Sequence, residues 1–102
     1  MFWWGPESGY TEERGLVIEY GYCDDLYEGD DWTFYYDFDL QNSKLFIELI
    51  GTGNDSASIE EYIKEHFDSR SALEEFCEKN GIHGKCTHIG EYPPAHFGPY
   101  EF

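Results

Sequence analysis

The segment from Trp32 to Leu40 alternates between apolar and polar side chains more regularly than any other part of the chain. Its apolar residues fall at every second position: Trp32, Phe34, Tyr36, Phe38 and Leu40. An α-helix would scatter these side chains around its circumference, because its side chains repeat about every 3.6 residues. The alternation therefore predicts a strand with one apolar face and one polar face.

Other segments are expected to pair with this strand. Alternation also predicts a strand from Gly15 to Cys23, with Val17, Glu19 and Gly21 on its polar face. A four-residue hairpin loop at Gln41–Lys44 would connect the Trp32–Leu40 strand to a second strong strand at Leu45–Ile50. The stretch from Lys85 to Tyr92 could form a last short strand before Pro93 and Pro94.

Two short helices are expected between residues 56 and 81. Ser58 and Glu61 have the spacing of a capping box, and so do Ser71 and Glu74. One helical face follows each capping box: Ile59, Tyr62, Ile63, His66 and Phe67 in the first helix, and Leu73, Phe76 and Cys77 in the second. His66 is therefore expected in the core, and Asn80-Gly81 is expected to end the second helix.

These elements predict an α+β fold: an antiparallel meander of three to four strands with two short helices packed on one face. A chain of 102 residues suits a single domain spanning 1–102. Residues 1–14 are expected to be a loop or edge segment, and residues 93–102 an irregular tail. Met1, Trp3 and Trp4 are expected to fold over an open sheet edge, and an exposed anchor for a partner is the alternative.

The chain is strongly acidic, with 22 Asp and Glu against 6 Lys and Arg and a net charge of −16. This balance excludes direct binding of nucleic-acid phosphates and disfavours docking on an anionic membrane. The cysteines Cys23, Cys77 and Cys86 are odd in number, which is a poor basis for a disulfide framework. The first residues lack the basic and apolar stretches of a secretory signal, so a cytoplasmic location with reduced thiols is expected.

The N-terminal part of the chain combines many acids with few bases, and aromatic residues lie among its acids. Residues 1–43 hold 11 acids and one base, Arg14. In a strand, Asp37 and Asp39 would project from the same open face, with acids of the preceding loop at its edge. The residues expected to bind a partner are Asp24, Asp25, Tyr27, Glu28, Asp30, Asp31, Trp32, Tyr35, Tyr36, Asp37 and Asp39.

An acidic face with exposed aromatic residues is complementary to a basic protein surface. We therefore expect a non-enzymatic inhibitor, without a cofactor, that occupies the nucleic-acid-binding groove of a nuclease or another basic protein. Proteins of the anti-CRISPR, anti-restriction and nuclease-immunity types act as nucleic-acid mimics in this way, and the likeness here is one of size, charge and architecture. A monomer or a small homo-oligomer is expected.

The alternative hypothesis is a zinc-stabilised structural or interaction module. Cys77, His83, Cys86 and His88 supply the sulfur and imidazole ligands that suit zinc, and four donors would close a tetrahedral site. Their spacing contains neither a C-x2-C knuckle nor an H-x3-H pair. Cys77 also lies on the apolar face of its helix, where a buried free cysteine is common.

Overall fold

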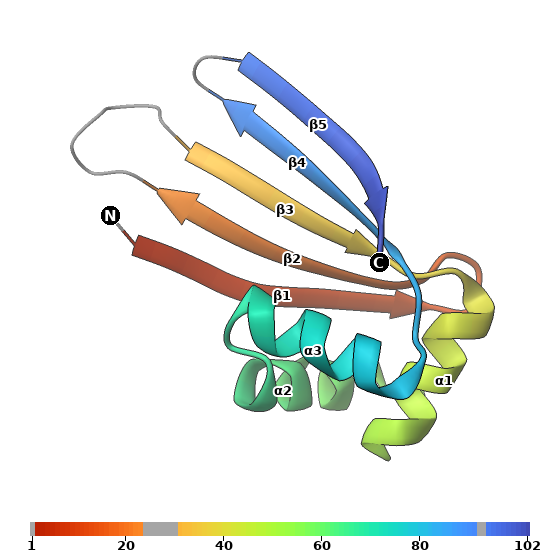
Figure 1. Ribbon diagram of the computed structural model, residues 1–102. Coiled ribbons are helices and arrows are strands. Elements are labelled where there is room, and N and C mark those ends of the chain that lie inside the picture. Colours follow the sequence, from red (N-terminus) through yellow and green to blue (C-terminus); the bar gives the residue numbers. More distant parts are fainter. Residues whose placement is uncertain (1, 24–30, 92–93) are drawn as a thin grey trace.

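The computed structural model describes residues 2–23, 31–91 and 94–102, which form a five-stranded antiparallel sheet and three α-helices (Figure 1). The strands are β1 (Phe2–Thr11), β2 (Gly15–Cys23), β3 (Asp31–Asp37), β4 (Lys85–Glu91) and β5 (Pro94–Glu101). The helices are α1 (Leu40–Ile50), α2 (Ser56–His66) and α3 (Arg70–Asn80). None of these helices has the length and apolar character needed to cross a bilayer.

The predicted α+β class and antiparallel meander are confirmed. Strand order in the sheet follows the chain, β1-β2-β3-β4-β5, and the three helices lie between β3 and β4 in the sequence. The helices gather on one side of the sheet (Figure 1). The core lies between these two layers and contains Ile18 and Tyr20 from β2, Phe46 from α1 and Leu73 from α3. The sheet therefore has one covered face and one face without helices.

The predicted strand at Leu45–Ile50 and the hairpin loop at Gln41–Lys44 are wrong, because both segments belong to α1. The Asp39 carboxylate accepts a hydrogen bond from the backbone N–H of Asn42 and caps this helix, and Gly51 ends it with a positive φ of 71°. Its buried residues, Ser43, Phe46, Ile47 and Ile50, repeat at helical spacing. A short apolar run is compatible with both the strand period of 2 and the helix period of 3.6. Here the caps at both ends, Asp39 and Gly51, favour the helix.

The predictions for both termini are also wrong. The segment expected as a loop, residues 1–14, contains β1, and the expected irregular tail, residues 93–102, contains β5. These two strands extend the sheet on either side of the expected one, β1 along β2 and β5 along β4. The strand predicted to reach Leu40 ends at Asp37, because Asp39 caps α1 and the chain becomes helical from Leu40 onward.

The two helices predicted from capping boxes are present, but each starts earlier than expected. The side chains that cap α2 and α3 are Asp55 and Ser69 rather than Ser58 and Ser71. Gly81 ends α3 with a φ of 68°, as the Asn80-Gly81 pattern predicts. His66 is exposed, contrary to expectation, because it is the last residue of α2 and its ring stacks on Tyr62 with centroids 4.1 Å apart.

Candidate functional site

We call the side of the sheet that faces away from the helices the outer face. Strand alternation and register place its residues in rows that cross neighbouring strands. The central row contains Glu7 on β1, Glu19 on β2, Tyr35 on β3 and Thr87 on β4. Tyr35 and Thr87 are partly exposed, although both lie in the middle of a sheet. A partner could therefore contact this row directly.

Glu7 and Glu19 are direct cross-strand partners in this row. Residues directly opposite in an antiparallel pair have Cβ atoms about 4.5–5.5 Å apart, so like charges there repel. Glu7 is exposed and Glu19 is half-buried. Partial burial raises the pKa of the Glu19 carboxyl above its usual range, and the nearby Glu7 carboxylate raises it further. A cation placed between the two carboxylates would favour their charged forms and so offset both effects on this pKa.

Trp4 borders the Glu7–Glu19 pair on the same face. Its cross-strand partner is Gly21, and a Cβ atom built on Gly21 would lie 1.7 Å from the indole ring. The ring therefore rests directly on the Gly21 backbone, which a larger residue would not permit. The pairing register shifts between Trp4 and Glu7, so these two residues share a face although they are three positions apart.

The next row along the sheet has mixed charge. Asp37 on β3 pairs with Lys85 on β4, which in turn pairs with Glu101 on β5. The basic side chain therefore stands between two acidic ones. Asp37 is exposed, as expected, but it lies opposite a cation of its own chain, unlike the Glu7–Glu19 pair.

The predicted Asp37–Asp39 row does not form. Asp39 lies beyond the end of β3, where its carboxylate caps α1, and the hydrogen bonds from Asn42 lower the pKa of this carboxyl. Both backbone and side-chain N–H groups of Asn42 donate to Asp39, at 2.8 and 3.0 Å. This residue therefore stabilises a helix end and contributes nothing to a row on the sheet.

The other predicted partner-binding residues fall into two groups. Within the described part of the chain, Asp31 lies at the start of β3, Trp32 is half-buried, and Tyr35 is half-buried on the outer face. The expectation that Tyr36 is an exposed anchor is wrong, because its ring is fully buried on the covered face. The rest lie outside the described residues: Asp24, Asp25, Tyr27, Glu28 and Asp30.

The buried Tyr36 belongs to a network that holds α3 on the sheet. The Arg70 guanidinium donates from Nε to the Tyr36 hydroxyl at 2.8 Å and from Nη2 to the Tyr100 hydroxyl at 3.2 Å. The guanidinium lies 3.7 Å from the centre of the Phe34 ring, and the Tyr100 hydroxyl donates to Glu74 at 2.9 Å. Burial raises the pKa of Tyr36, so its hydroxyl stays protonated and accepts the Arg70 bond.

The four residues of the zinc hypothesis do not form a metal site. Among the described residues, no three His, Cys, Asp or Glu side chains come together in an arrangement that could hold a metal ion. Cys77 and Cys86 are buried free thiols on α3 and β4. His83 is exposed and contacts the Phe102 carbonyl through Nδ1 at 3.1 Å, and the His88 ring packs on Phe34 with centroids 4.4 Å apart.

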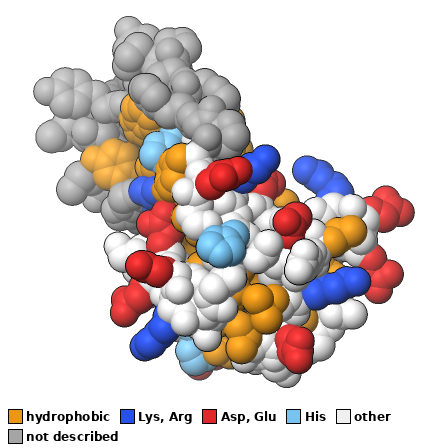
Figure 2. All heavy atoms as spheres, turned by 45° about the vertical axis from the view of Figure 1, so that its right-hand side comes forward, with side chains coloured by type: hydrophobic (Ala, Val, Ile, Leu, Met, Phe, Trp, Pro, Cys, Tyr) orange, Lys and Arg blue, Asp and Glu red, His pale blue; other side chains and the backbone are white. Residues whose placement is uncertain are grey.

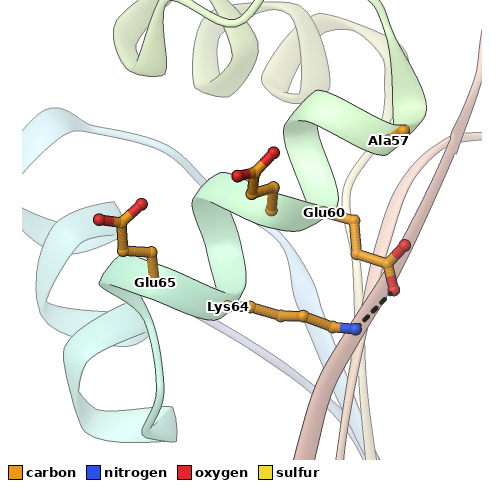
Figure 3. Close-up of a pocket in the computed structure, with 5 residues that line it drawn as sticks. Ala57, Glu60, Lys64 and Glu65 are labelled. Atoms are coloured by element: carbon orange, nitrogen blue, oxygen red, sulfur yellow. Dashed lines mark ion pairs between the residues drawn. The ribbon is translucent and has the colours of Figure 1, made fainter.

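The helical side of the molecule has a different charge pattern. A shallow hollow along α2 is lined by Ala57, Glu60, Glu61, Lys64 and Glu65 (Figure 3). There, Lys64 Nζ lies 3.3 Å from a carboxylate oxygen of Glu60, while Glu65 points away from this ion pair (Figure 3). In the view of Figure 2, basic side chains likewise stand among the acidic ones. The hollow is a feature of an open helix surface and does not enclose a ligand site.

Comparison of the chain with protein-family models, with curated proteins and with solved structures finds no match.

Sequence reasoning missed Glu7 and Trp4 as outer-face residues, because the segment that contains them was expected to be a loop. Glu19 was correctly assigned to the polar face of its strand, next to Gly21. A usable signal was the aromatic pair Trp3-Trp4 with Gly21 in a facing strand, since glycine inside a strand marks a close approach by another group.

Proposed function

We propose that this protein is an inhibitor that binds the basic, nucleic-acid-binding surface of a target protein. The observation that carries the proposal is the excess of carboxylates, 22 against 6 basic side chains. A small soluble domain typically carries a net charge of roughly 2–8 in magnitude, so −16 exceeds what solubility requires. Such an excess lowers the stability of the folded state through repulsion between the acidic side chains. Binding to a basic partner would offset this repulsion.

The chain does little to neutralise its own acids. Arg70 directs its guanidinium to the hydroxyls of Tyr36 and Tyr100 and to the Phe34 ring. Lys64 pairs with Glu60, and Lys85 lies between Asp37 and Glu101. These three cations therefore leave most of the carboxylates available to a basic partner.

Electrostatic complementarity would act in two ways. It would speed association with a basic groove and disfavour partners that carry negative charge. Because nucleic-acid-binding grooves are basic along their length, an acidic protein seated there competes with the nucleic acid itself. The outer face adds partly exposed aromatic side chains and the exposed Ile89, which retains 38% of its accessible surface. Tyr and Trp are the residue types that anchor interfaces.

Capture from the lysate of the native host tests the proposal. The tagged chain is washed at low and then moderate salt, and bound proteins are identified by mass spectrometry. We expect one basic nucleic-acid-binding protein, which is released by salt and displaced by added DNA or RNA. Recovery of many basic proteins in proportion to their abundance, or of none, would contradict the proposal. A captured protein that keeps its nucleic-acid binding in the presence of this chain would also contradict it.

A further inference from the structure

We infer that the outer face docks an arginine side chain of the basic partner, with its guanidinium between the carboxylates of Glu7 and Glu19 and against the ring of Tyr35. This inference rests on the proposed function and specifies the contact through which the basic partner is recognised. Three properties of the outer face indicate which group it binds: its charges, the side chains around these charges and the area of the face.

The need for a cation comes from the central row. Glu7 and Glu19 are directly opposed, and Glu19 is half-buried. Within the described strands of the outer face, the basic side chain is Lys85, which lies two strands from Glu19 and opposite Asp37. Arg14 lies beyond these strands, in the turn between β1 and β2, where it lines a hollow with Gly9 and Val17. The chain therefore places two carboxylates together without a cation of its own beside them, and a partner cation is complementary to both.

The preference for arginine over lysine comes from the neighbouring rings. Tyr35 is the cross-strand partner of Glu19, and the Trp4 indole lies over Gly21, two residues along β2 from Glu19. A guanidinium is planar, forms paired hydrogen bonds with carboxylates and stacks on aromatic faces. A lysine ammonium is a strongly hydrated point charge and gains less from the rings.

A second copy of this chain does not suit the face. It would bring its own Glu7 and Glu19 against the first pair, and each copy carries a net charge of −16. Five strands about 4.8 Å apart and about seven residues long give a face of roughly 450 Å² in plan. A standard interface buries about 800 Å² on each partner. The outer face can thus form the centre of an interface whose rim comes from its surroundings.

The test compares two double variants of the full chain with the same charge. The variants E7Q/E19Q and E61Q/E65Q each remove two carboxylates, the second pair from the exposed side of α2. Binding of a nine-residue arginine peptide and a nine-residue lysine peptide is measured by titration at physiological salt, and NMR amide shifts locate the bound peptide. The expected result is a loss of at least tenfold in arginine-peptide affinity for E7Q/E19Q and less than threefold for E61Q/E65Q.

The wild-type protein is expected to prefer the arginine peptide several-fold, with shifts on β1, β2 and β3, and E7Q/E19Q is expected to lose this preference. Equal losses in the two variants, equal affinity for the two peptides, or shifts over the helices would overturn the inference. A urea titration of each variant shows whether the fold is retained.

The lysate capture separates this inference from the proposed function. A target that E7Q/E19Q captures as well as the wild type does would refute the arginine contact and leave the proposed function standing. If an arginine peptide binds the outer face but the lysate capture recovers no target, the arginine contact would be supported and the proposed function refuted.

Discussion

Neutralising Glu7 is expected to stabilise the fold, although most substitutions in a protein destabilise it. Glu7 and Glu19 face each other across β1 and β2, and Gln keeps the size and polarity of the side chain. Two unit charges about 6 Å apart repel by about 0.7 kcal/mol in bulk water and about 3 kcal/mol at an effective dielectric constant of 20. Because Glu7 is exposed, we take a value near the lower limit, about 0.5 kcal/mol. This gain corresponds to a rise in Tm of roughly 2–4 °C for a domain of this size.

The pH dependence of this gain follows from the raised pKa of Glu19. A carboxyl whose pKa is higher in the folded than in the unfolded state destabilises the fold above that pKa, and this penalty disappears as the pH falls through it. The difference in unfolding free energy between E7Q and wild type is therefore expected at pH 7, and it should diminish as the pH falls through the raised pKa of Glu19. It should also shrink in 1 M NaCl, because salt screens exposed charges.

Urea titration followed by circular dichroism measures the gain, since urea, unlike guanidinium, is uncharged. E101Q is the matched control: it removes one carboxylate from the same face, but from a position opposite Lys85, and should give no gain. In the double variant E7Q/E19Q the gain should fall short of the sum of the single gains by about 0.5 kcal/mol, because the repulsion is removed only once. Additive gains, or a gain at pH 7 that 1 M NaCl does not reduce, would refute the reasoning.

Three further predictions concern the scaffold. Gly21→Ala should displace the Trp4 indole, shift the tryptophan fluorescence and cost about 1–3 kcal/mol of unfolding free energy. Ser43→Ala should cost about 1–3 kcal/mol in a urea titration, because the fully buried Ser43 hydroxyl accepts the Leu16 N–H at 2.8 Å and its loss leaves that donor unpaired. Burial raises the pKa of Cys77 to about 12, so peptide mapping should find this thiol unlabelled by iodoacetamide at pH 8 in the native protein and labelled in urea.

The fold was predictable in segments whose apolar residues are compatible with only one spacing, either the strand period of 2 or the helix period of 3.6. β2 and β3 were predictable because their apolar residues fall at every second position, and α2 and α3 because theirs repeat at helical spacing. The segment that forms α1 satisfies both periods, since Leu45, Ile47 and Leu49 alternate while Phe46, Ile47 and Ile50 share a helical face. The Asp39 cap and Gly51 resolve the conflict in favour of the helix.

The candidate site was less predictable than the fold, because it depends on pairing between segments. Sequence alternation assigns Glu19 and Tyr35 to polar strand faces, but it does not show which residues of other strands lie beside them. Conversely, the acidic residues that the composition singled out include Asp39, whose carboxylate is used to cap α1. A count of charges thus indicates the kind of partner but does not locate the contact.

The irregularity in β1 explains how the outer-face row arises. Without the register shift between Trp4 and Glu7, strand alternation would place these two residues on opposite faces. With it, both face outward, while Tyr10 further along β1 points into the core. A regular strand that kept Trp4 opposite Gly21 would place Glu7 opposite the buried Ile18, where a carboxylate would lose its hydration without gaining a partner. The bulge therefore keeps the Glu7 carboxylate out of the core. As a direct consequence, it places Glu7 opposite Glu19 on the face without helices.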